Sequence, residues 1–163
     1  MPPRLLRAQD VAARRVLGRA KCVKSPMTIR RGEPGDLPAV AAIQEASPEA
    51  AHWDVGEYLN YDFEVAVCGA DVAGFRVARA LGEGECELLN LAVEPSFRRQ
   101  GIGRRLLQTL LAGPPNTVWL EVRESNAIAR NFYGIMGFQE FGRRVEYYSS
   151  PDEAGIVMKF HSC

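Results

Sequence analysis

The chain has 163 residues, of which 20 are basic and 20 acidic, so its formal net charge is zero. This length suits one domain with a proper core, and 47% hydrophobic with 25% charged residues is ordinary for a globular protein. No stretch approaches the run of about 20 apolar residues that a transmembrane helix needs. Four widely spaced cysteines, with no Cys-x-x-Cys, and two distant histidines indicate neither a zinc site nor a disulfide framework, and we expect reduced cysteines.

The charge is unevenly distributed along the chain. Residues 1–26 carry seven Lys or Arg and one acid, Asp10, whereas residues 27–163 carry thirteen basic and nineteen acidic residues. Three interpretations of this basic N-terminal arm stay open: an artefact of a start codon placed ahead of a true start at Met27, an arm that docks on an acidic partner such as RNA, and an Arg-rich targeting segment. We therefore divide the chain into a basic arm at residues 1–26, for which disorder is one of the alternatives, and a folded domain at residues 27–163.

In the first half of this domain, strand patterns flank two helical segments. Asp36 caps the first helix, and a turn at residues 68–71 joins two strands into a hairpin. The expected elements are a strand at Thr28–Arg31, helices at Ala39–Ala46 and within Glu49–Tyr61, and strands at Phe63–Val67, Val72–Ala80 and Glu87–Val93.

The second half begins with a helix that ends near Ala112. The strand Thr117–Arg123 alternates, with Val118, Leu120 and Val122 on one face and Glu121 among the residues of the more polar face. The remaining expected elements are a helix at Ala127–Met136 and strands at Phe138–Arg144 and Ile156–Phe160.

A glycine loop lies between the strand that ends at Val93 and the next helix. Gly101 and Gly103 stand where the helix begins, with arginines around them. A helix start exposes unpaired N–H groups and partial positive charge, and glycine lets a ligand approach the backbone, so the loop predicts an anion site suited to phosphates. It is not a Walker loop, and Leu106 stands where the Rossmann fingerprint needs a third glycine.

The loop fits the pattern Arg/Gln-x-x-Gly-x-Gly/Ala through Arg98, Gly101 and Gly103. In this it resembles the pyrophosphate loop of the GNAT superfamily of N-acetyltransferases, which bind acetyl-CoA. The resemblance implies an α/β (α+β) fold, a mixed sheet of six or seven strands that splays open between its fourth and fifth strands, flanked by about four helices. It covers residues 28–160.

A second match is more specific. The run from Trp119 to Asn126 (Trp-Leu-Glu-Val-Arg-Glu-Ser-Asn), with Tyr133 downstream, resembles the RimI-like ribosomal-protein-alanine N-acetyltransferases. Their substrate is the N-terminal alanine of a small-subunit ribosomal protein. One departure is Glu153-Ala154, where such proteins usually have Asp-Ala, and the connection before it also looks short.

The resemblance implies roles for the residues that match. Backbone groups of the strand end would pair with the pantetheine arm, the N–H of Val93 would polarise the thioester carbonyl, and Asn126 would bond the pantetheine amide. The expected acetyl-CoA-binding residues are Leu91, Ala92, Val93, Arg99, Gln100, Gly101, Ile102, Gly103, Arg104, Asn126 and Tyr133; no metal is expected.

Two residues are the catalytic candidates. Glu121 would be the general base, through a water, and Tyr133 the general acid that protonates the leaving thiolate. Taken by themselves, Glu121 also fits a solvated strand residue or a partner of Arg123, and Tyr133 also fits a core aromatic.

The acceptor residues and the cellular setting follow from the same resemblance. Large amphipathic rings and an arginine are expected at a peptide groove: Trp53, Tyr58, Arg144, Tyr147 and Tyr148. The expected function is N-terminal acetylation of a ribosomal protein in the cytoplasm, with no membrane partner. Two alternatives stay open: acetylation of another amine (a lysine side chain, a polyamine or an antibiotic), and an acyl-CoA-binding protein without catalysis.

Overall fold

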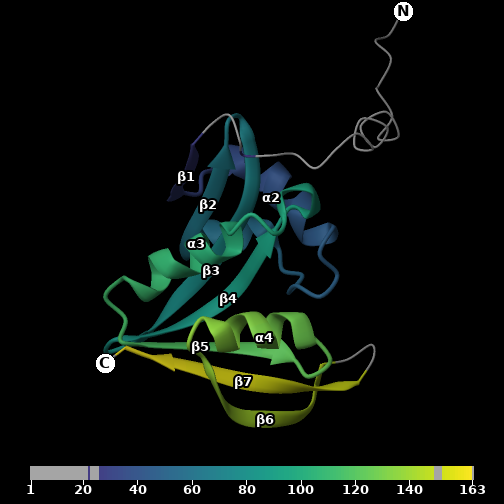
Figure 1. The fold of residues 1–163 in the computed structure, drawn as a ribbon, viewed down its shortest axis with the longest axis vertical. Helices are drawn as coiled ribbons and strands as arrows, with labels where there is room; N and C mark the ends of the chain where they lie inside the picture. The colour runs from purple at the N-terminus through teal and green to yellow at the C-terminus, as the bar shows by residue number, and fades with distance from the viewer. Residues whose placement is uncertain (1–21, 23–25, 149–151, 163) are drawn as a thin grey trace, which may run out of the picture.

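The computed structural model describes residues 22, 26–148 and 152–162 of the chain (Figure 1). Its strands form one sheet of seven in the order β1-β2-β3-β4-β5-β7-β6, antiparallel at every step except the parallel pair β4–β5. The strands are β1 (Met27–Arg31), β2 (Asp62–Cys68), β3 (Asp71–Gly82), β4 (Glu85–Val93), β5 (Thr117–Arg123), β6 (Gln139–Tyr148) and β7 (Glu153–His161).

The described part of the chain contains three α-helices and three short 3-10 helices. The helix expected within residues 49–61 is one of the 3-10 helices. The α-helices are α2 (Leu37–Glu45), α3 (Ile102–Leu111) and α4 (Ala127–Ile135), and the 3-10 helices are η2 (Pro34–Asp36), η3 (Val55–Asn60) and η4 (Pro95–Phe97).

The sheet splits between β4 and β5, as the family resemblance implies. These strands pair only where Glu85–Glu87 meets Thr117–Trp119. Beyond this point β4 continues to Val93 with only β3 as its partner, so one backbone edge of β4 faces a gap between the two halves of the sheet. Figure 1 shows the two halves diverging, with α3 beside the first and α4 beside the second.

The hydrophobic core confirms the predicted alternation of β5. Val118, Leu120 and Val122 are 0%, 2% and 6% exposed and pack in one cluster with Leu107 and Leu110 of α3. Partly buried residues of α4 pack on the same cluster, so both helices cover this face of β5. The side chain of Glu121 therefore projects from the opposite face.

The cysteine expectation is wrong for two of the four residues. Cys22 and Cys68 form a disulfide across a sequence separation of 46, and the backbone N–H of Cys22 donates to Oε1 of Gln100 in the glycine loop, at 3.2 Å. The bridge ties the basic arm to the end of β2, and a chain that began at Met27 would lack it. The other residues of the arm, apart from Pro26, lie outside the described part.

Reduction of the Cys22–Cys68 bridge should lower the free energy of unfolding by about 2–4 kcal/mol, because the closed loop restricts the unfolded chain. Urea titrations with and without dithiothreitol measure this difference. In the Cys22→Ser variant the reductant should have no effect. A wild-type urea midpoint that does not change when dithiothreitol is added would contradict the prediction.

Candidate active site

The glycine loop has a backbone that only particular residues adopt easily. Gly101 caps α3 in the left-handed conformation, at φ +77°, and Arg99 also has a positive φ of +60°. A Cβ added at residue 101 would meet no atom within 4 Å, so the backbone conformation rather than lack of space favours glycine there. The first N–H groups of α3 have no partner within the helix, as an anion site requires.

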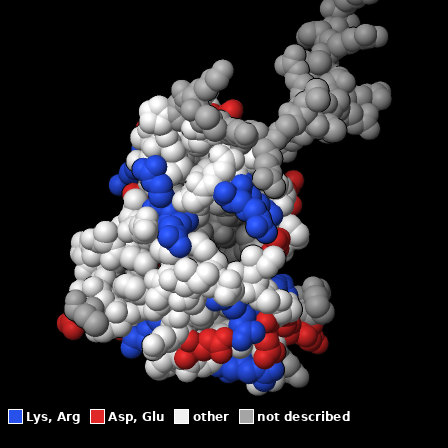
Figure 2. All heavy atoms as spheres, in the orientation of Figure 1, with Lys and Arg blue, Asp and Glu red and all other residues white. Residues whose placement is uncertain are grey.

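The second glycine of the loop lies at the mouth of the split. A Cβ added at Gly103 would lie 3.6 Å from Val93 of β4 and 3.8 Å from Phe132 of α4. The space kept open at Gly103 is thus bounded by β4 of the first half of the sheet and by α4, the helix beside the second half. Figure 2 shows basic side chains around a hollow on the face that carries α3 and α4.

Arg98 does not point into this space but fastens the loop. Its Nε donates to the carbonyl of Val93 at 3.2 Å, and its Nη2 donates to Oγ of Ser47 at 3.1 Å. On the other side of η4, the carboxylate of Glu94 accepts from the N–H of Ser96 at 2.7 Å. The motif arginine therefore holds the loop against β4 and against the segment after α2.

The N–H of Val93 is directed into the split. The next N–H, of Glu94, donates to the carbonyl of Ala73 at 2.8 Å, on the side of β3. Successive N–H groups of a strand point to opposite sides, so that of Val93 faces away from β3. The N–H of Leu91 faces the same way, and Oδ1 of Asn90 accepts from it at 3.0 Å.

A buried polar network supports this end of β4, and sequence reasoning missed two of its members. The amide nitrogen of Asn90 donates to the hydroxyl of Tyr58 at 2.9 Å and to the carbonyl of Ala51 at 2.8 Å. The hydroxyl of Tyr58 donates to Oε1 of Gln44, whose Nε2 donates to the carbonyl of Trp53 at 2.7 Å. A lone amide inside an apolar pattern, such as Asn90 or Gln44, is the sequence signal that could have revealed them.

Tyr58 accordingly needs a correction. The resemblance placed it at the acceptor groove, but its side chain is 0% exposed and packs between Phe63 and Phe75. Burial raises the pKa of its hydroxyl. Tyr58 anchors the segment from residue 47 to residue 60, while Trp53 in that segment is 41% exposed and available to a ligand.

The candidate acid and a candidate cofactor ligand lie on α4. Asn126 caps the helix through Oδ1, which accepts from the N–H of Ala129 at 3.1 Å, so its amide nitrogen remains the group to meet a carbonyl. Tyr133 stacks edge-on against Phe132 and Phe138, with ring centroids 5.2 and 5.6 Å away. Desolvation raises the pKa of Tyr133, which keeps its hydroxyl protonated.

Glu121 lies on the other face of the sheet, in a pocket of about 300 Å³. Its Oε1 is 2.9 Å from Nη1 of Arg144, and a second ion pair, Arg79 with Glu87 at 2.7 Å, lines the same pocket. Trp119 also lines this pocket, and the ammonium of Lys159 lies over its ring, 4.8 Å from the ring centroid. Tyr147 and Tyr148 belong to β6, but their side chains lie outside the described part.

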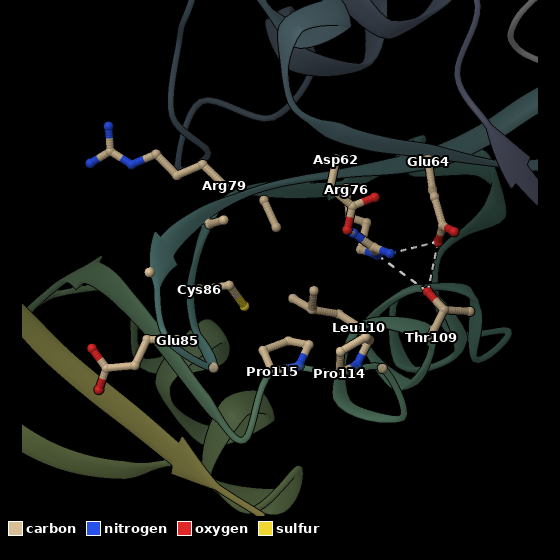
Figure 3. A pocket seen from close by; sticks show the side chains of 15 residues that line it. Asp62, Glu64, Arg76, Arg79, Glu85, Cys86, Thr109, Leu110, Pro114 and Pro115 are labelled. Carbon is tan, nitrogen blue, oxygen red and sulfur yellow. Dashed lines mark hydrogen bonds and ion pairs between the residues drawn. The ribbon is translucent and has the colours of Figure 1, made fainter.

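A larger pocket, of about 580 Å³, contains none of the predicted site residues (Figure 3). Its buried Arg76 is 3% exposed on its side chain and contacts Asp62 at 2.8 Å, Glu64 at 2.9 Å and Thr109 at 3.2 Å. These carboxylate partners are expected for Arg76, because a buried charge without a partner strongly destabilises the fold. Burial raises the pKa of Cys86, also in this lining, to about 11, so its thiol stays protonated and a poor nucleophile.

The described part of the chain comprises residues 22, 26–148 and 152–162. No helix there is long and apolar enough to cross a membrane. No group of three or more His, Cys, Asp and Glu in the same residues is arranged to hold a metal ion.

The geometry of the split and the loop agrees with comparisons to known proteins. The profile of the Acetyltransferase (GNAT) family matches residues 36–138. The chain belongs to the GNAT family. It is therefore an N-acetyltransferase, and its seven-stranded sheet with the parallel β4–β5 step is the fold of that family.

Individual relatives confirm the more specific resemblance. The ribosomal protein bS18-alanine N-acetyltransferase of Escherichia coli K12 is 36% identical over 145 residues, which cover 80% of this chain and 95% of that protein. The crystal structure of the Escherichia coli ribosomal-protein-S18-alanine N-acetyltransferase matches with a TM-score of 0.73 and 32% identity, covering 85% of this chain and 96% of that one. Ard1 from Thermoplasma volcanium matches with a TM-score of 0.77 and 28% identity, covering 84% and 98%.

Proposed function

We propose that this enzyme transfers an acetyl group from acetyl-CoA to the N-terminal alanine of a small-subunit ribosomal protein. The observation that carries the proposal is that Glu121 and Tyr133 flank the strand β5 at the split from opposite faces of the sheet. A cofactor that threads the split would then meet an acid on one side and an acceptor with its base on the other. The name of the Escherichia coli relative supplies the acceptor.

The cofactor would run from the glycine loop into the split. The N–H groups at the start of α3 would bind the pyrophosphate, and the free edge of β4 from Leu91 to Val93 would pair with the pantetheine arm. The amide nitrogen of Asn126 would donate to a pantetheine carbonyl from the far side. The N–H of Val93 would then donate to the thioester oxygen as it gains negative charge.

The transfer would be direct. The amine nitrogen attacks the thioester carbon, the carbon–sulfur bond breaks, and the products are the acetylated N-terminus and the free thiol of CoA. An α-amino group has a pKa of about 7.7–8.0, so a modest base suffices to deprotonate it, and Glu121 would accept this proton. The hydroxyl of Tyr133 would give its proton to the departing thiolate and recover one from solvent.

The acceptor would approach the face of the sheet that carries Glu121. Trp53 is exposed on the segment that the buried amides hold, and Arg144 borders the pocket around Glu121. We expect Tyr147 and Tyr148 to contribute to the same groove, since β6 supplies both.

A thiol-release assay with two peptides tests the function. Both begin Ala-Arg-Tyr-Phe; the first has a free N-terminus, and the second is N-terminally blocked and contains a lysine. Turnover of the free-amine peptide alone supports the proposal. Turnover of the lysine peptide would assign side-chain acetylation instead, and binding of acetyl-CoA without either turnover would support the cofactor site but not the acceptor.

A further inference from the structure

The ion pair between Glu121 and Arg144 joins two strands that are not neighbours. In the sheet, β7 lies between β5 and β6. Gly155 of β7 is the register partner of Arg144 on one side and of Arg123 on the other. Glycine has no side chain, so Arg144 can lie across β7 and bring Nη1 to 2.9 Å from Oε1 of Glu121.

The two partners differ in how far they are exposed. The side chain of Glu121 is 18% exposed, whereas that of Arg144 is 56% exposed. The carboxylate is thus part of the pocket wall, and the guanidinium reaches it from the solvent side. The second carboxylate of the pocket, Glu87, is bound by both Nε and Nη2 of Arg79, at 2.9 and 2.7 Å.

The acceptor must bring a cation to this same place. An N-terminal amine is mostly protonated at pH 7, because its pKa is about 7.7–8.0. It therefore arrives as an ammonium and needs the carboxylate of Glu121 as its partner before it can lose a proton. The acetylated product is a neutral amide and has no such need.

We propose that Arg144 is a resident counter-ion that occupies the position of the acceptor's α-ammonium at Glu121 and is displaced when the acceptor binds. This inference rests on the proposed function. It makes Arg144 a specificity residue: a cationic amine can exchange with the guanidinium, and a neutral, already acetylated terminus cannot. After transfer, the neutral amide leaves Glu121 without a cationic partner, so Arg144 returns and the product is not held by the carboxylate.

The inference makes an unusual prediction for Arg144→Gln. Without its competitor, the free-amine peptide should bind more tightly, and its KM should fall about two- to fivefold, the range of a partly exposed ion pair. The inhibition constant of the N-acetylated peptide should stay unchanged, because the amide does not compete for Glu121. The conservative variant Arg144→Lys keeps a cation and should keep a KM near that of the wild type.

The chain offers a matched control in the preceding residue. Arg143 is 52% exposed and contacts Glu124 through two hydrogen bonds of 2.9 Å, outside the Glu121 pocket. Arg143→Gln should therefore leave the KM of both peptide and acetyl-CoA unchanged. Adding Glu121→Gln to Arg144→Gln should abolish the gain in peptide affinity, measured by calorimetry where turnover is too slow.

The outcomes separate the inference from the function on which it rests. A wild-type enzyme that acetylates no N-terminus overturns the proposed function. A wild-type enzyme that does so, with a peptide KM that rises or stays constant in Arg144→Gln, overturns the counter-ion role. A rise would assign Arg144 to direct contact with the acceptor.

Discussion

Replacement of Glu121 by glutamine should lower kcat/KM for the free-amine peptide by about a hundredfold or more at pH 7, the usual size of a general-base contribution. The amide has nearly the shape of the carboxylate and can still accept a hydrogen bond from Arg144, so folding should be unaffected. It cannot take up a proton. The rate measured by thiol release should therefore fall while the KM of acetyl-CoA stays constant.

The pH dependence makes the assignment sharper. As pH rises past about 8 the acceptor amine loses its proton to solvent, and the need for an internal base declines. The deficit of Glu121→Gln should thus shrink between pH 7 and pH 9. Glu124→Gln is the matched control, because Glu124 is 41% exposed on its side chain and pairs with Arg143 outside the pocket. An activity of Glu121→Gln within threefold of wild type at pH 7 would remove Glu121 from the mechanism.

The local sequence patterns predicted the elements around the site well. The alternation of Thr117–Arg123 correctly assigned Val118 and Leu120 to the core, because period-two patterning is a direct result of strand geometry. The two glycines correctly marked the start of α3, since few residue types other than glycine easily adopt the positive φ of residue 101. The resemblance supplied the mixed character of the sheet and its split, which local patterns do not contain, whereas the order of the strands came from the structure alone.

The features missed depend on contacts between distant segments. Nothing near Cys22 indicates that it meets Cys68, because 46 residues separate them and only the pairing of β1 with β2 brings the region together. The family resemblance assigned Tyr58 to the groove together with Trp53, and the sequence offers no sign against it, because an aromatic ring suits both a core and a binding surface. Its ring is buried against Phe63 and Phe75, and its hydroxyl is satisfied there by Gln44 and Asn90, from two other elements.

The second large effect is expected at Tyr133. The Tyr133→Phe variant keeps the ring that packs on Phe132 and Phe138 and removes only the hydroxyl. Without a proton donor the leaving group departs as a thiolate, and we expect kcat to fall about 10²-fold, with the KM of acetyl-CoA little changed. The initial rate of thiol release at saturating peptide measures kcat. Tyr61→Phe, which removes a hydroxyl from a residue packed in the other core cluster, should have no effect.

The raised pKa of Tyr133 fixes the direction of two further measurements. Its hydroxyl stays protonated beyond the ordinary tyrosine pKa of about 10. A plot of kcat against pH should therefore show no decline below about pH 10 from loss of the acid form.

In the unfolded chain the same hydroxyl ionises near about pH 10. The contribution of Tyr133 to the free energy of unfolding is therefore present below that pH and declines above it. Tyr133→Phe should reduce this alkaline loss of stability.

A second acyl donor tests the acid role directly. A donor whose leaving thiol is more acidic depends less on a proton from the enzyme, so it should recover much of the rate that Tyr133→Phe loses with acetyl-CoA. Equal losses of rate with the two donors would mean that Tyr133 positions the cofactor and does not act as its acid.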